Sequence, residues 1–271
     1  MTELRYEGSD GCPLYAFSLT DSIDKTKPVL IMLHGGGPDH YSLIPLARNI
    51  DYPQIVLPDI RGYGRSICYD ETRYKWEQYA ADIISLLNYL DCPKAILCGA
   101  GIGTTISLRT TISAPDRIDS LILISIEDIE DDEAKMAEIK FLDEFATNVR
   151  AYGLEVAWAP ILKNLSPVIG DMVRDAIPRS DADSIAAAAA IGYDRAFNNI
   201  NELSVISAPV LIIPGADERH PTELAEDIGK LLPNGYISPL SMSGNIQSVE
   251  DFSQYFAPII NTFLRTIHNL W

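Results

Sequence analysis

Residues 95–105 read AILCGAGIGTT, an apolar run that ends in three glycines at alternate positions. A short apolar run that meets a glycine-rich turn is typical of a buried strand, and the helical spacing that follows it indicates a helix. Glycine allows the sharp turn between the two. We therefore predict a strand at residues 95–98, a helix at residues 103–113 and a tight turn around Gly101.

Outward from this turn, apolar runs and helical segments alternate along most of the chain. Such alternation predicts an α/β protein with a mostly parallel, eight-stranded sheet that helices flank. The turn Ser9-Asp10-Gly11 joins the first two strands. The expected strands are residues 3–7, 13–18, 29–33, 55–57, 95–98, 120–126, 210–213 and 236–239, and the further helices are residues 72–90, 221–232 and 250–267.

The alternation breaks in one long segment, where only helical patterns occur. We interpret residues 128–206 as a helical lid inserted into a core that residues 1–127 and 207–271 form. An acidic run, residues 127–133, leads into the lid, where negative charge favours the positive end of a helix dipole. The helical patterns are residues 136–149, 168–176 and 182–197. The apolar residues that suit either the lid's own core or an apolar ligand are Leu142, Phe145, Trp158, Ile161 and Leu162.

The composition excludes several classes of function. Of 271 residues, 38 are acidic and 21 are basic, and the formal charge of −17 repels nucleic acid. No apolar stretch is long enough to span a membrane and the first residues lack the pattern of a signal peptide, so we expect a cytoplasmic protein without a membrane partner. The four cysteines have no metal-ligand spacing, which indicates reduced thiols, and we expect no metal and no cofactor.

Glycine-rich or acidic loops follow four of the expected strands, and the carboxyl ends of parallel strands are where α/β sheets bind ligands. The first loop reads HGGGP at residues 34–38, and the second reads DIRGYGRS at residues 59–66. With its motifs in this order, the chain resembles the α/β-hydrolase superfamily from about Arg5 to Leu264, and within it the branch that contains proline iminopeptidases. The resemblance implies a Ser, Asp and His triad, with the serine at the centre of a G-x-S-x-G turn. The four loops are residues 33–38, 58–66, 98–105 and 214–221.

Two of the three triad positions depart from the family pattern. The turn reads GAGIG, so Gly101 stands where the serine would be, and Asn245 stands where the family has its histidine. Asp217 matches the acid, with Glu218 and Glu127 as alternatives. Triad residues act as a unit, and asparagine cannot take up a proton near neutral pH. The sequence therefore argues against an acyl-enzyme mechanism.

Backbone groups could still polarise a carbonyl group. The resemblance implies an oxyanion hole made by the N–H groups of Gly36 and Ile102, and such a donor stabilises a developing oxyanion by about 3 kcal/mol. His34, Gly35 and Gly37 complete the turn, and we expect His34 to support this loop through hydrogen bonds.

Side chains for proton transfer are the remaining requirement. We expect His40 at the pocket mouth or in solvent, whereas His220 either faces the site or only marks the start of a helix. The candidates for acid/base catalysis are Asp217, Glu127 and His40. The residues that match a displaced nucleophile only poorly are Cys98, Thr104 and Thr105.

We interpret the chain as an enzyme that uses non-covalent carbonyl chemistry, of the lyase, cyclase, isomerase or decarboxylase type, on a small apolar molecule with a carbonyl group. One alternative is a ligand-binding protein without catalysis. Another is a hydrolase in which Asp217 or a histidine activates water directly. The glycine turns do not separate these alternatives, because glycine is also needed for the backbone geometry.

Overall fold

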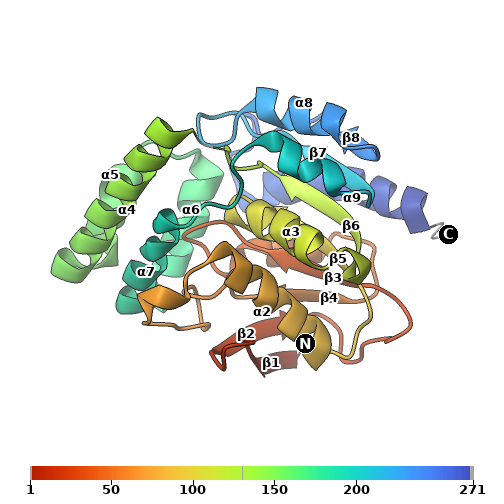
Figure 1. Ribbon diagram of the computed structural model, residues 1–271, viewed down its shortest axis with the longest axis horizontal. Helices are drawn as coiled ribbons and strands as arrows, with labels where there is room; N and C mark the ends of the chain where they lie inside the picture. The colour runs from red at the N-terminus through yellow and green to blue at the C-terminus, as the bar shows by residue number, and fades with distance from the viewer. Residues whose placement is uncertain (1, 130, 269–271) are drawn as a thin grey trace.

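An eight-stranded sheet in the order β1-β2-β4-β3-β5-β6-β7-β8 forms the centre of the molecule (Figure 1). The computed structural model describes residues 2–129 and 131–268. β2 pairs antiparallel with β1 and β4, and all pairings from β4 to β8 are parallel, so the expected mostly parallel sheet is confirmed. The strands are β1 (Thr2–Glu7), β2 (Pro13–Ser18), β3 (Val29–Leu33), β4 (Ile55–Pro58), β5 (Ala95–Ala100), β6 (Ile118–Ile124), β7 (Val210–Ile213) and β8 (Gly235–Ile237).

Helices cover both faces of the sheet, with α2 and α3 in front of the strands and α9 behind them in Figure 1. Side chains alternate along each strand, so Val29 and Ile31 belong to the core on the side of α2, α3 and α8, whereas Leu30 and Met32 belong to the core on the side of α1 and α9. Burial on both faces explains why these strands read as unbroken apolar runs. The flanking helices are α1 (Ile44–Ala47), α2 (Trp76–Tyr89), α3 (Ile102–Ser113), α8 (Thr222–Leu231) and α9 (Val249–His268).

Among the described residues between β6 and β7, the regular structure is helical. Asp131 caps α4 by accepting a hydrogen bond from the N–H of Ala134, and Asp132 and Glu133 lie in its first turn, as the dipole argument expects, while Glu130 lies outside the described residues. The expected lid boundaries stay a prediction. The helices of this segment are α4 (Asp132–Tyr152), α5 (Leu154–Leu162), α6 (Pro167–Ala176) and α7 (Ala182–Ala188).

Several helix ends differ from the sequence prediction. α2 begins at Trp76 instead of residue 72, because Asp70 caps a separate 3-10 turn before it. α7 ends at Ala188, and a 3-10 turn continues the chain to Tyr193. α5 was not predicted, since Pro160 lies inside it.

The helices α4, α5 and α7 share a small core. Phe145, Val149 and Ile185 are buried together, and the partly buried Trp158 packs against this cluster. Phe145, Trp158 and Ile161 therefore serve packing among these helices, whereas Leu142 packs against the core of the sheet. Trp158 also reaches the HGGGP turn, because its indole would lie 2.8 Å from any Cβ at Gly37.

A buried arginine joins the N-terminal hairpin to the rest of the sheet domain. Arg61 donates from Nε and Nη2 to the carboxylate of Asp82, at 2.8 and 2.7 Å, and from Nη1 and Nη2 to that of Asp10, both at 2.9 Å. Asp10 lies in the turn between β1 and β2, and Asp82 lies on α2. Two carboxylates on one guanidinium compensate the cost of burying its charge.

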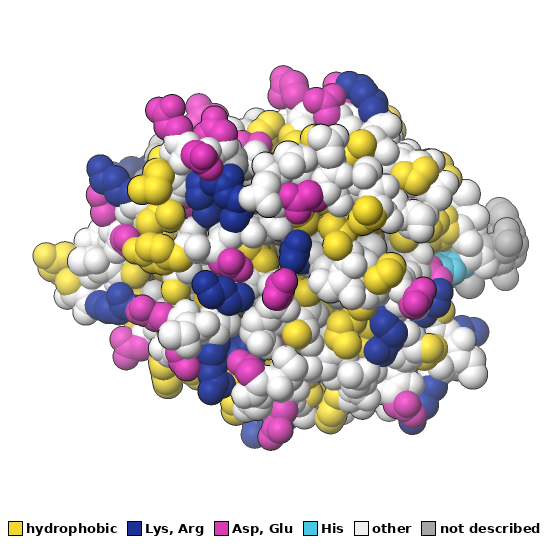
Figure 2. Space-filling model, viewed as in Figure 1, with side chains coloured by type: hydrophobic (Ala, Val, Ile, Leu, Met, Phe, Trp, Pro, Cys, Tyr) yellow, Lys and Arg dark blue, Asp and Glu magenta, His cyan; other side chains and the backbone are white. Residues whose placement is uncertain are grey.

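Charge on the surface is mixed. Figure 2 shows acidic and basic side chains interspersed over one face, not gathered in a single patch. None of the described helices combines the length and the hydropathy needed to cross a bilayer.

Candidate active site

The turn after β5 keeps a strained strand-to-helix geometry around Gly101, which has φ +50° and ψ −122°. A Cβ at Gly99 would collide with the backbone of Gly103, and a Cβ at Gly103 would lie 2.5 Å from the carbonyl oxygen of Leu33. These two glycines are therefore required by close packing. Position 101 is different, because the nearest atoms to a Cβ there would be 3.7 Å away, which is ordinary van der Waals contact.

The side chains near Gly101 that carry nucleophilic atoms are engaged elsewhere. Thr104 Oγ1 donates a hydrogen bond to the carbonyl oxygen of Gly101 at 2.7 Å, and Thr105 Oγ1 donates to Glu127 Oε2 at 3.0 Å. Burial raises the pKa of the Cys98 thiol to about 12. None of the three is placed as a substitute for a serine at position 101.

The HGGGP turn lies directly against this elbow. The Cα atom of Gly35 is 3.7 Å from the Cβ position of Gly101. Among the described residues, neither the N–H of Gly36 nor that of Ile102 has a protein acceptor, and Ile102 begins α3, whose dipole adds positive potential there. Both groups are free to donate to a ligand, and their role as an oxyanion hole stays a prediction.

His34 holds the HGGGP turn to the loop after β4. Its Nε2 accepts a hydrogen bond from the N–H of Ile60 at 3.0 Å, so its Nδ1 carries the proton and donates to the carbonyl oxygen of Gly35 at 2.8 Å. Burial is the largest influence on this imidazole and lowers its pKa. The hydrogen bonds give His34 the supporting place that the sequence predicted.

The expected position of His40 is wrong. Its ring is 2% exposed and packs against Tyr15 and Phe17 of β2, at centroid distances of 5.4 and 5.5 Å, so it is neither in solvent nor at a pocket mouth. Nδ1 donates to Asp59 Oδ1 at 2.7 Å, and among the described residues Nε2 has no hydrogen-bond partner. The cause is the 3-10 turn that follows Asp39, which directs the ring inward.

Asp217 and His220 form a second hydrogen-bonded pair in the loop after β7. Asp217 Oδ1 accepts from Nδ1 of His220 at 2.8 Å and from the N–H groups of Arg219 and His220, each at 3.0 Å. The hydrogen bond from His220 is the largest cause that holds the pKa of Asp217 below its usual range. In the neutral imidazole that donates from Nδ1, Nε2 keeps its lone pair, and this atom lies 3.7 Å from the Cβ position of Gly101.

The structure therefore brings a histidine to Gly101 from the loop that carries the acid. Asn245, which the family resemblance puts at the histidine position, is exposed, and among the described residues no hydrogen bond joins it to Asp217. Sequence reasoning named His220 but did not select it. The spacing Asp217-x-x-His220 was the available signal.

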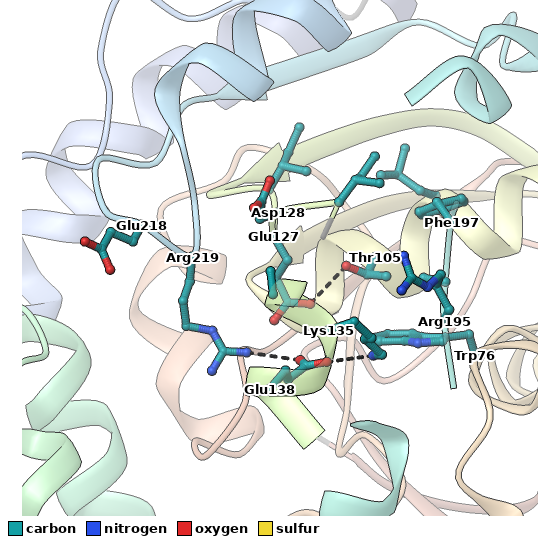
Figure 3. Close-up of a pocket in the computed structure, with 15 residues that line it drawn as sticks. Trp76, Thr105, Glu127, Asp128, Lys135, Glu138, Arg195, Phe197, Glu218 and Arg219 are labelled. Atoms are coloured by element: carbon teal, nitrogen blue, oxygen red, sulfur yellow. Dashed lines mark hydrogen bonds and ion pairs between the residues drawn. The ribbon is translucent and has the colours of Figure 1, made fainter. Parts of the chain in front are cut away.

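Glu127 lies in a pocket of about 280 Å³ that opens beside α3, one helical turn beyond Gly101 (Figure 3). Glu138 accepts from Lys135 Nζ at 2.6 Å and pairs with Arg219 at 3.3 Å across this pocket. Glu218, the other alternative acid, is exposed, and its side chain points away from these residues in Figure 3. The apolar part of the wall consists of Trp76, Leu108, Ile126, Ile129, Ala134, Ala196 and Phe197.

Tyr63 was not singled out in the sequence, yet it lies near Gly36 and close enough to Glu127 to feel its charge. Its hydroxyl oxygen is 3.8 Å from the Cβ position of Gly36. Burial first, and then the negative charge of Glu127, raise the pKa of Tyr63 to about 12. The phenol is therefore a neutral hydrogen-bond donor near neutral pH.

A sequence profile of the alpha/beta hydrolase fold family matches residues 28–234. The chain belongs to this family. Among its curated relatives, the 3-oxoadipate enol-lactonase 2 of Acinetobacter baylyi is 27% identical over 171 residues, which are 60% of this chain and 61% of that protein, so the match spans less than two thirds of the relative.

Solved structures of the alpha/beta hydrolase fold agree over nearly the whole chain. MenH from S. aureus has a TM-score of 0.80 and 22% identity, and the match covers 94% of this chain and 99% of that one. The bottromycin epimerase BotH, solved in complex with bottromycin A2, has a TM-score of 0.71 and 13% identity, with 98% and 100% covered. At these identities the likeness shows the shared fold alone.

Proposed function

We propose that this protein catalyses proton transfer on a small, apolar carbonyl compound without forming an acyl-enzyme, as an isomerase, lyase, cyclase or decarboxylase does. The observation that carries the proposal is Gly101. The elbow keeps its strained backbone and its close packing, but the atom that would attack a carbonyl carbon is missing.

The chemistry follows from the groups around the elbow. A substrate carbonyl group is polarised when its oxygen accepts hydrogen bonds from the N–H groups of Gly36 and Ile102. A proton on the neighbouring carbon then becomes more acidic. A basic side chain takes that proton, and the negative charge moves to the oxygen, where the two N–H groups stabilise it. The epimerase among the structural neighbours supports the idea that this fold accommodates chemistry other than hydrolysis.

The pocket beside α3 favours one second candidate, a ligand-binding protein without catalysis. Trp76 and Phe197 give it aromatic walls, and about 280 Å³ is close to the lower size of small-molecule sites. We place either function in the cytoplasm, because the four cysteines are free and buried thiols.

The test combines two measurements on the purified protein. A panel of small ketones and β-keto acids is incubated in D₂O, and NMR follows exchange of the protons next to the carbonyl group. A fluorophosphonate probe and an activated ester report covalent catalysis. We expect exchange without labelling. Labelling at Cys98 or a threonine would overturn the proposal in favour of covalent catalysis, and a ligand that raises Tm without exchange or product would favour the binding protein.

A further inference from the structure

We propose that His220 is the general base of this site and that Asp217 orients it, in place of the base that the family carries after its last strand. The inference rests on the proposed function, because it names the group that takes the proton. It assigns a catalytic residue that the position of Asn245 would never indicate.

The imidazole of His220 is directed at Gly101. A turn from Asp217 to His220 is enough to explain the 2.8 Å bond between their side chains, since aspartate readily bonds residues two or three positions ahead. The turn does not explain why Nε2 points to Gly101, which is 119 residues away in the sequence. A Cβ built on Gly101 would lie only 3.7 Å from Nε2. The line from Asp217 through both ring nitrogens to position 101 is the arrangement of an acid, a base and a nucleophile site.

The loop that carries His220 is firmly held by its packing and hydrogen bonds. Any Cβ at Gly215 would collide with Cβ and the carbonyl oxygen of His220, so the loop folds back on a residue that must be glycine. Thr222 Oγ1 donates to the carbonyl oxygen of Gly215 at 2.7 Å and fixes the other end. The imidazole is thus set in one orientation before a ligand arrives, while 22% of its side chain stays accessible.

The proton transfer balances within the site. Nε2 takes a proton from the carbon beside the substrate carbonyl, and the electron pair of that C–H bond forms the enolate, whose negative charge lies on the carbonyl oxygen. This oxygen accepts hydrogen bonds from the N–H groups of Gly36 and Ile102. The imidazolium, hydrogen-bonded to Asp217, then returns the proton to the substrate. No other reactant is consumed.

The experiment places the missing nucleophile next to the proposed base. Gly101→Ser puts a hydroxyl within reach of Nε2, and we expect hydrolysis of p-nitrophenyl acetate to rise at least ~100-fold above the wild-type protein, with fluorophosphonate labelling at residue 101. Adding His220→Gln should remove at least ~100-fold of that gain, whereas adding Asn245→Ala should leave it intact. Gly101→Ala has the same backbone strain without the hydroxyl and controls for folding.

Two results would overturn the assignment. One is a folded Gly101→Ser protein that stays inert until Asn245→His is added, and the other is an active Gly101→Ser protein that His220→Gln does not impair. The readout needs no knowledge of the natural substrate, so it succeeds or fails separately from the exchange assay that tests the proposed function.

A second measurement uses the wild-type chain, in case substitutions at position 101 do not fold. Chloroacetone can bind with its oxygen on the two N–H groups, so that Nε2 of His220 displaces chloride and forms an N–C bond. The four cysteines are buried and compete weakly. We expect mass spectrometry to find one alkylated residue, His220, and no alkylation at this position in Asp217→Ala or His220→Gln. Alkylation of another histidine instead would overturn the assignment.

Discussion

Two His–Asp pairs in this molecule have nearly the same hydrogen bond and opposite surroundings. Nδ1 lies 2.7 Å from Oδ1 in His40–Asp59 and 2.8 Å in His220–Asp217, but side-chain exposure is 2% and 0% in the first pair and 22% and 66% in the second. Nε2 of His40 is enclosed among aromatic rings, and Nε2 of His220 faces Gly101. The length of the Asp–His bond therefore does not identify a base. What identifies it is the group that the other ring nitrogen faces.

The largest expected difference between the pairs is in stability. Asp59→Ala leaves Nδ1 and the N–H of His40 and the N–H of Arg65 without their acceptor in a buried place, so we expect a loss of about 3 kcal/mol in the free energy of unfolding. Asp217→Ala, the matched control, should cost less than about 1 kcal/mol because its side chain is largely exposed. Urea denaturation measures both, and equal losses would remove the distinction.

In activity the order of the pairs reverses. His220→Gln should lower the rate of carbonyl proton exchange by about 100-fold, and Asp217→Asn should lower it at least ~10-fold, because the amide no longer offers the charge that stabilises the imidazolium. Urea midpoints should change little in either variant. Asn245→Ala serves as the control with an unchanged rate. Full activity in His220→Gln would place the base elsewhere.

At low pH, the two His–Asp pairs should again differ in the stability that they contribute, by a smaller amount. Burial is the largest influence on the pKa of Asp59 and raises it, but the hydrogen bond and charge of His40, together with the other donors, bring that pKa below its usual value. A lowered pKa in the folded state gives stability that is complete above the unfolded value of about 4 and is lost as the pH falls through the folded value.

Urea denaturation across this acid range should thus show that the free energy of unfolding falls steeply with pH in the wild-type protein and less steeply in Asp59→Asn. The pKa of Asp217 is also lowered, yet water screens this exposed carboxylate, so Asp217→Asn should follow the wild-type curve closely. If the free energy of unfolding of Asp59→Asn fell with pH as steeply as that of the wild-type protein, the role given to this carboxylate would be contradicted.

The smallest effect is expected at Glu127. Glu127→Gln keeps an oxygen that can accept from Thr105, and its pocket lies one turn of α3 away from Gly101, so the exchange rate should change by less than about threefold. Kinetics with the best exchange substrate measure it. A loss near that of His220→Gln would move the proton acceptor from the exposed His–Asp pair into the pocket.

Local pattern was enough to predict the sheet, because the strands β3, β4 and β7 are buried along their whole length and read as unbroken apolar runs. It failed where position depends on distant packing. The burial of His40 depends on the rings of Tyr15 and Phe17, which nothing in the sequence around His40 indicates. The place of His220 depends on a loop that folds onto Gly215 and on the parallel pairing of β5, β6 and β7, which puts their carboxyl ends at the same edge of the sheet.

Arg61 has a consequence for the order in which the N-terminal half assembles. Its two carboxylate partners lie 51 and 21 residues away, on the hairpin and on α2. Without Asp10, the N–H groups of Nη1 and Nη2 that donate to it would be buried without their acceptor, so intermediates with the hairpin detached leave these groups in water. The hairpin, the loop after β4 and α2 thus dock in one cooperative step. Proteolysis within the first ten residues should therefore release all three together.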